Sequence, residues 1–573
     1  MPGSNFTHQR RSAMRARRQW SSLLLAALLT FTVVPLQTAQ AQPAAGRDQV
    51  VIGMSQEPDF LNPMFAEMAA AVAVLDTIFV SDIERDNTWK LFAQGVEAIP
   101  NLKDGTWKLD GDRMTLVWKI KPRNWSDGRP VTCADFVFTH NAARNEQVPV
   151  IVRDLTNRIS NIVCTKGASG TDITVNWKER YAYANLTITE YGALPRHVLE
   201  KYYRANPSKL NESPYGNDPA ITIGDGAYKL VEWRKGASMT VEAVSNHKLF
   251  GTPRIKRITW RFIPDTNALV ANMLSGAIDA IGTIGVTFDQ AVQLDRQAAG
   301  RFKVFFEEGL IWEHIDFNLD NPLVADVRVR RAIAHGINRE QMVQQLFGGK
   351  QPVSHSYLPT KHPGYTSQGL TTYPYDPARA RALLQEAGFT PGPDGVLRNA
   401  QGQRLSLELN TTAGNRVREQ VEQIIQQNLR EVGIEIRIQN YPARVYFGEI
   451  TNRRKFPAMA MYAWVMSPTS DCDQLYTSDG IPNEGNGWAG QNYPGYKNAE
   501  MDRLCKAASR EVDEAKRNQL LNQSVQLFSR DIPALPLYIR ASVAAAKPGL
   551  QGFTAVQLSA TYETWNVHRW FWQ

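Results

Sequence analysis

The stretch Leu116–Val137, LVWKIKPRNWSDGRPVTCADFV, decides the fold because it places a strand, a turn and a helix start in immediate succession. Its first six residues alternate Leu, Trp and Ile with Val and Lys, which is the period of a half-buried strand. The run Asp127-Gly128-Arg129-Pro130 predicts a tight turn, since glycine tolerates positive φ and proline fixes its own φ. Thr132, with Asp135 three positions later, predicts a capped helix start. The stretch is typical of an α/β fold and carries no catalytic constellation.

Residues 1–41 have the pattern of a secretory signal peptide. Five arginines without an acidic residue precede the apolar run 23–34, and Ala39 and Ala41 offer small residues at a cleavage site before Gln42. The apolar run is too short to span a bilayer comfortably. No cysteine follows it, so we expect a cleaved leader and a periplasmic protein that is not a lipoprotein.

Charge and length restrict the function classes. The formal net charge is +8, and the five leader arginines account for most of it, which leaves about +3 for the mature chain. A nearly balanced surface is not typical of nucleic-acid binding, so no nucleic-acid partner is expected. About 530 mature residues exceed what a single hydrophobic core serves, so we expect at least two lobes.

Periodicity along the mature chain predicts mixed α/β architecture. Strands are predicted at 49–54, 173–177, 240–243 and 257–263, and a helix at 266–275. Asp376-Pro377 predicts a helix that ends at Gly388. A second amphipathic helix over 417–432 ends at Gly433, and the alternation of three isoleucines predicts a strand over 434–438. Helices that alternate with strands predict an α/β fold with mixed sheets.

The opening stretch resembles a segment of the family 5 solute-binding proteins, the bacterial receptors that deliver peptides, nickel complexes and related solutes to ABC importers. Five further runs match the family in the same order: 225–230 (DGAYKL), 274–279 (LSGAID), 326–340 (DVRVRRAI and INRE), 375–389 (YDP to AGF) and 531–537 (DIPALPL). Each run is weak by itself. Six runs in the right order make the resemblance specific, and it covers the chain from about residue 48 to the C-terminus.

The resemblance implies the fold of a two-lobed periplasmic binding protein, class II-like, with mixed β-sheets and an extra subdomain in lobe I. Lobe I is expected at 48–308 and lobe II at 309–539, and the segment 540–573 is expected to return to lobe I. The extra subdomain is expected near 88–205. The two chain crossings of the hinge are expected near 307–311 and 537–540.

The implied function is a monomeric periplasmic receptor that captures a solute, with peptide as the leading class, between two closing lobes and delivers it to ABC permease subunits. The alternative is a receptor for a non-peptide solute such as a nickel chelate or a small organic compound. A secreted hydrolase is the rival from another class, but the chain has no GxSxG, SxxK or HExxH motif. We therefore expect no enzyme and no cofactor.

The four cysteines, Cys133, Cys164, Cys472 and Cys505, are expected to form disulfides in an oxidising compartment. Three pairings are possible and the sequence does not select one. Cys133–Cys164 with Cys472–Cys505 is favoured because each loop then stays inside one lobe. Without CxxC or HExxH, no metal site is expected.

Ligand contacts are carried over from the family residue by residue. Glu67 matches a cleft-facing acidic position of oligopeptide-binding relatives, with the backbone of Met68 and Ala69 beside it; the alternative is an exposed glutamate at a helix start. Tyr462 and Trp464 match the run that opens the amine-recognition loop of the family. The alternative position for Trp464 is the core.

This chain departs from the family after Trp464. Peptide binders have an aspartate there that holds the α-ammonium of the ligand, whereas Met466 and Ser467 stand near its place here. Either Asp471 or Asp473 is displaced into that role, or the ligand has no free amine at this point.

Further contacts are expected from the strand after the hinge and from one Gly/Asn-rich loop. Trp312 and Glu313 lie on a strand that faces the ligand in relatives, and Trp488 and Asn492 lie in the loop. A solvated strand end and an ordinary surface loop are the alternatives. His314 and His355 are the candidates for a nickel complex.

Overall fold

The computed structural model describes residues 47–573 except 67, 151, 168, 299, 474 and 557–560. The leader expected at 1–41, and with it the expected cleavage site, lies outside the described residues, and so does Glu67.

A mixed ten-stranded sheet forms the frame of the molecule, in the order β16-β15-β17-β12-β18-β11-β1-β10-β9-β8. β1 pairs in parallel with β10 and β11, and β15 with β16 and β17, while the other neighbours are antiparallel. Its strands are β1 (Gln49–Met54), β8 (Tyr228–Arg234), β9 (Ser238–Ala243), β10 (Arg257–Phe262), β11 (Ala280–Ile281), β12 (Lys303–Phe317), β15 (Ser406–Asn410), β16 (Glu435–Ile438), β17 (Met459–Val465) and β18 (Ala534–Ala546).

Smaller sheets complete the strand set. A four-stranded sheet has the order β4-β5-β7-β6 and lies within the range expected for the extra subdomain. It contains β4 (Trp107–Asp110), β5 (Arg113–Lys119), β6 (Ile159–Cys164) and β7 (Asp172–Trp177). Three two-stranded sheets pair β2 (Ile83–Arg85) with β3 (Leu91–Ala93), β13 (Thr390–Pro391) with β14 (Leu397–Arg398), and β19 (Leu550–Gln551) with β20 (Phe571–Trp572).

The helices are α1 (Ala69–Ile78), α2 (Cys133–Arg144), α3 (Asp154–Arg158), α4 (Arg196–Ala205), α5 (Thr266–Ser275), α6 (Phe288–Ala298), α7 (Pro322–Ala325), α8 (Val327–Gly336), α9 (Arg339–Phe347), α10 (Pro377–Glu386), α11 (Arg416–Glu431), α12 (Ala443–Val445), α13 (Ala499–Arg510) and α14 (Glu514–Asp531). A π-helical turn covers Tyr446–Thr451. Single 3₁₀ turns cover Ala184–Leu186, Pro207–Glu212, Ser478–Gly480, Glu484–Asn486 and Val567–Arg569.

The opening stretch folds as its sequence predicts. β5 ends at Lys119, and α2 starts at Cys133 behind a capping box in which Asp135 Oδ2 accepts from the Thr132 backbone N–H at 2.9 Å. The buried members of β5, among them Leu116 and Trp118, alternate with exposed ones. The disulfide Cys133–Cys164 ties the start of α2 to the end of β6.

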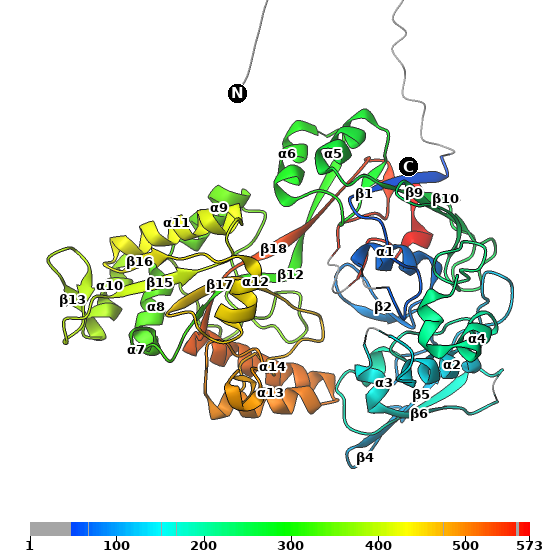
Figure 1. The fold of residues 1–573 in the computed structure, drawn as a ribbon, viewed down its shortest axis with the longest axis horizontal. Helices are drawn as coiled ribbons and strands as arrows, with labels where there is room; N and C mark the ends of the chain where they lie inside the picture. The colour runs from blue at the N-terminus through cyan, green and yellow to red at the C-terminus, as the bar shows by residue number, and fades with distance from the viewer. Residues whose placement is uncertain are drawn as a thin grey trace, which may run out of the picture. The chain divides into compact units, whose positions relative to one another are not determined.

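Two separate hydrophobic cores define two lobes. One core is built from residues between 315 and 538, and another from residues between 50 and 305 together with residues 544–570. The long strands β12 and β18 run side by side from one lobe to the other (Figure 1).

The register between β12 and β18 shifts between Glu308 and Trp312. Residues 309–311 of β12 there lie opposite a single residue of β18, Arg540. This bulge lies where the two chain crossings of the hinge are expected.

Candidate functional site

Three adjoining cavities share lining residues, and residues of both lobes line the first of them. Their volumes are about 440, 390 and 280 Å³. Leu186 lines all three, Arg85 joins the first cavity to the third, and Asp76 joins the third to the second. We call the three cavities together the groove, and the 440 Å³ cavity the Arg85–Arg517 pocket.

Segments far apart in sequence build the Arg85–Arg517 pocket. One wall comes from the β2–β3 hairpin and from Tyr183, and the other from Lys361, Pro468 and the first turns of α14. Arg517 spans the two walls, since its Nη1 donates to the carbonyl oxygen of Ala182 at 3.2 Å. Residues of both lobes therefore meet in this pocket.

The pocket has a cationic lining. Arg85, Lys90, Lys361 and Arg517 line it together with one carboxylate, that of Glu514. Lys361 forms an ion pair with Glu307 at 3.1 Å. His362 also lines the pocket, and burial, followed by the charges of Arg85 and Arg517, lowers its pKa to about 3. His362 is therefore neutral at physiological pH.

The cavity that shares Arg85 with this pocket contains two carboxyl groups. Asp76 and Glu84 line the 280 Å³ cavity together. Burial, and then the charge of Glu84, raises the pKa of Asp76 well above its usual value, while burial raises the pKa of Glu84 to about 7. The Asp76 carboxylate accepts from the Thr564 hydroxyl at 3.0 Å. Burial therefore disfavours the charged form of both carboxyl groups.

The loop after β17 borders the groove through Pro468. Met466, expected as a ligand contact, is buried, and its backbone N–H donates to the Leu310 carbonyl at 2.8 Å. The Ser467 hydroxyl lies 3.0 Å from that of Thr469 and 3.2 Å from that of Ser470. The two residues near the place of the amine-binding aspartate are therefore held by β12 and by the loop itself.

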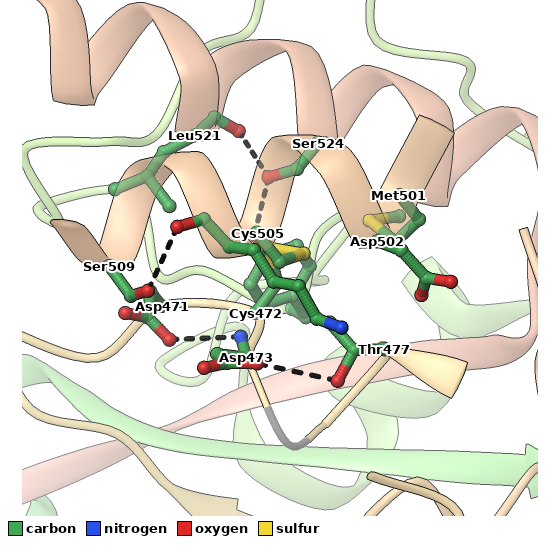
Figure 2. The surroundings of a disulfide bond; sticks show 12 residues. Asp471, Cys472, Asp473, Thr477, Met501, Asp502, Cys505, Ser509, Leu521 and Ser524 are labelled. Atoms are coloured by element: carbon green, nitrogen blue, oxygen red, sulfur yellow. Dashed lines mark hydrogen bonds between the residues drawn. A yellow bond between two sulfur atoms is a disulfide. The ribbon is translucent and has the colours of Figure 1, made fainter. Parts of the chain in front are cut away.

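Asp471 lies farther along the same loop, next to the disulfide Cys472–Cys505 that ties the loop to α13. Figure 2 shows Asp471 and Asp473 on either side of Cys472. The Asp473 backbone N–H donates to Asp471 Oδ1 at 2.9 Å. Burial raises the pKa of Asp471 to about 7, against the lowering effects of that hydrogen bond and of Arg517. The two disulfides are the pairs that the sequence analysis favours.

Four of the residues expected to contact ligand occupy packing or structural positions. Trp312, Glu313, Tyr462 and Asn492 have at most 1% of their surface exposed. The side-chain nitrogen of Asn492 donates to the carbonyl oxygens of Thr477 and Tyr496, and its side-chain oxygen accepts from the backbone N–H of Tyr496.

Glu313 forms ion pairs with Arg418 and Arg540, and Tyr462 donates to Asp316. The four side chains are buried in this structure, although Glu313 lines a cavity of about 410 Å³ together with Arg418 and Arg540, and their ligand role stays a prediction. Sequence spacing identifies the strands but not the long-range partners that bury them.

Two expected aromatic residues remain half-buried. The Trp464 ring stacks on Tyr493 with centroids 5.7 Å apart, and Trp488 lies under the guanidinium of Arg453 at 5.8 Å. Met68 and Ala69, at the start of α1, pack partly buried against the core of the first lobe. Ala66 lines the 390 Å³ cavity.

The histidines expected for a nickel complex do not lie together with other ligands. His314 is buried and its Nε2 lies 3.4 Å from Asp316, while burial lowers the pKa of His355 to about 4. Within residues 47–573, the gaps aside, no cluster of three or more His, Cys, Asp or Glu side chains is arranged to hold a metal ion.

Sequence reasoning missed the charged residues that line the groove. Arg85, Arg517, Asp76 and Glu84 belong to no motif, and they come from ends of the chain that only the fold brings together. An arginine inside an amphipathic helix, such as Arg517 of α14, has the pattern of a solvated face.

Two lobes joined by paired strands, with a groove lined from both, define a substrate-binding protein of the two-lobed periplasmic type. The chain belongs to the bacterial extracellular solute-binding proteins, family 5, whose model matches residues 97–486. Among the described residues, no helix is long and apolar enough to cross a membrane.

Named relatives match this chain over 61% to 97% of its length. It is 25% identical to the oligopeptide-binding protein AppA of Bacillus subtilis, over 97% of this chain and 99% of the relative. It is 26% identical to the glutathione-binding protein GsiB of Salmonella paratyphi A, over 61% of this chain and 66% of the relative.

Among solved structures, the oligopeptide-binding protein of Thermus thermophilus, complexed with a pentapeptide, is 30% identical. That alignment covers 92% of this chain and 96% of the neighbour, with a TM-score of 0.61.

Proposed function

We propose that this chain is the substrate-binding receptor of an ABC importer, and that its ligand is a peptide held in the groove. The observation that carries the proposal is that segments of both lobes line the Arg85–Arg517 pocket of the groove. A ligand that contacts both walls stabilises the closed arrangement, because those contacts are complete only when the lobes meet. Relatives named for oligopeptide binding support peptide as the ligand class.

The expectations about export, location, oligomeric state and permease partner belong to the same proposal. Residues 1–41 would direct export and be removed, and the mature protein would act in the periplasm as a monomer without a lipid anchor. It would pass its ligand to permease subunits at the inner membrane and would perform no chemistry on it. The lobe boundaries near residues 308 and 539 would coincide with the bulge at Arg540.

A first experiment identifies the ligand that the protein carries. The mature protein is purified without added ligand and denatured, and the released compounds are measured by mass spectrometry. A mixture of short peptides is expected, because backbone-directed recognition tolerates many side chains. A single non-peptide compound would contradict the peptide class, although the protein would remain a solute receptor.

A second experiment tests the receptor role itself. A pool of synthetic tri- to pentapeptides should raise the thermal unfolding temperature, since binding at 100 times Kd stabilises the folded state by about 2.7 kcal/mol. A pool of free amino acids at the same concentration serves as the control. If neither peptides nor the compound released on denaturation shift the transition, the receptor role is wrong.

A further inference from the structure

The Arg85–Arg517 pocket contains two guanidiniums that the protein leaves without a carboxylate partner. Arg517 is only 8% exposed, and its Nη1 donates to two carbonyl oxygens, those of Ala182 and Glu511, while its Cζ lies 4.6 Å from the centre of the Tyr183 ring. These contacts satisfy donors but supply no negative charge. Within the described part of the chain Arg517 forms no ion pair.

Arg85 lies on the opposite wall of the pocket and also lacks a carboxylate partner among the described residues. Its Nη1 donates to the Trp89 carbonyl at 3.3 Å, and it forms no ion pair with any described residue. Burial lowers the pKa of Arg85, against the opposing effects of Tyr183, Glu514 and Glu84. The charges of Arg85 and Arg517 both act on Tyr183 and His362, which line the same pocket, so both guanidiniums contribute positive charge to that pocket.

The neighbouring acidic residues do not neutralise this charge. Asp471 is influenced by Arg517, yet burial keeps its pKa near 7, so it is partly protonated at neutral pH. Glu514 is exposed to solvent, and Lys361 is already paired with Glu307. A buried guanidinium without a compensating charge is costly, and a carboxylate that binds in a bidentate manner removes that cost.

Asp76 and Glu84 line the adjoining cavity, whose lining also includes Arg85. Burial raises the pKa of both carboxyl groups, so they supply little negative charge to the guanidiniums at neutral pH.

We propose that the Arg85–Arg517 pocket is a carboxylate subsite, in which the two guanidiniums hold an anionic carboxylate group of the ligand. This inference rests on the proposed function and deepens it, since it makes an acidic group at one end of the ligand a determinant of affinity. The carboxylate can come from the C-terminus of a peptide or from an aspartate or glutamate side chain.

The test uses random pentapeptide libraries and native mass spectrometry of the mature protein. One library has free C-termini, a second has C-terminal amides, and a third has amides with glutamate fixed at the last position. Arg85→Gln and Arg517→Gln remove each charge, and Arg85→Lys and Arg517→Lys retain it. Arg234→Gln is the matched control, because Arg234 is exposed on β8 and outside the groove.

The wild type should bind the free acids at least tenfold more tightly than the amides. Each Gln variant should bring that ratio below about threefold, each Lys variant should keep part of it, and Arg234→Gln should keep all of it. Recovery of binding by the third library would assign the pocket to a side-chain carboxylate, and no recovery would assign it to the C-terminus. Thermal melting of every variant verifies that it is folded.

Equal binding of acids and amides by the wild type, with no gain from the fixed glutamate, would overturn the subsite while peptide binding stands. A large ratio that survives both Gln substitutions would also overturn it, because another group would then hold the carboxylate. Failure of all three libraries to bind would refute the peptide function itself and the subsite with it.

Discussion

Glu313 shows how a single buried charge can hold the hinge together. Its carboxylate is fully buried on β12, one residue beyond the slipped register, and it is paired with Arg540 of β18 and with Arg418 of α11. Burial by itself raises the pKa of Glu313, but Arg540 and Arg418 outweigh it and hold the pKa below its usual value. The carboxylate therefore joins both crossing strands to the second lobe.

Replacement of Glu313 by Gln should destabilise the protein by about 2–4 kcal/mol, because two guanidiniums then face one another without an anion. Urea unfolding measures the change. Glu97→Gln is the control, since Glu97 forms an exposed pair with Lys119 and its loss should cost less than about 1 kcal/mol.

The contribution of the Glu313 charge should also follow pH. Because the folded pKa lies below the unfolded value of 4.5, the stabilisation is complete above pH 4.5 and is lost as pH falls through the folded pKa. The difference between wild type and Glu313→Gln should therefore shrink on acidification. A difference that stays constant down to low pH would contradict the ion-pair account.

The carboxyl group of Asp471 should change the pH dependence of folding stability in the opposite direction to that of Glu313. Its pKa rises from 3.8 in the unfolded chain to about 7 in the folded one, so between these values the folded state holds a proton that the unfolded state has released. Stability should then fall with rising pH over this window, by up to about 1.4 kcal/mol per pH unit. Asp471→Asn should flatten the slope, whereas Asp110→Asn, at an exposed position of β4, should leave it unchanged. Urea titrations from pH 4 to 7 measure it; an unchanged slope in Asp471→Asn would show that the carboxyl ionises normally.

At the scale of elements, each disulfide closes a loop of nearly the same length. The separations are 31 residues for Cys133–Cys164 and 33 for Cys472–Cys505. Chain entropy therefore predicts that the two double serine variants lose similar stability, about 2–4 kcal/mol each. Only Cys472→Ser/Cys505→Ser should also weaken ligand binding, because that disulfide anchors the loop that contains Pro468 and Asp471 (Figure 2). Urea unfolding and peptide titration of both variants test this; equal effects on affinity would show that the anchored loop has no role in the groove.

Local signals were sufficient to predict many of these elements. The strand predicted at 49–54 is β1, the helix predicted at 266–275 is α5, and Gly433 ends α11 with a φ of 86°. These features depend on periodicity and capping, which neighbouring residues determine. The burial of β12 and β17 depends instead on strand neighbours more than 100 residues away, so the sequence did not predict that Trp312 and Tyr462 would be buried.

At the scale of the whole molecule, the groove joins segments that the sequence separates by more than 400 residues. The wall of Arg85 belongs to the first lobe and the wall of Arg517 to the second, and beside them Trp89 packs in one hydrophobic cluster with residues of α14. Family motifs predicted the two lobes because they record the order of elements. They did not predict the charge of the groove, because no motif contains the residues that line it.

Ligand binding should slow hydrogen exchange on both walls together. A peptide that contacts residues 83–91 and 512–518 at once stabilises the closed arrangement, and local opening of either wall then requires the loss of contacts with both. The bulge at 309–311 should change its exchange rate as well, because the chain crossings absorb the closure. The hairpin of β13 and β14, which lines none of the three groove cavities, is the internal control. Mass-spectrometric exchange with and without the peptide pool measures all four segments in one experiment; protection confined to one wall would mean that the ligand binds a single lobe and that closure does not accompany binding.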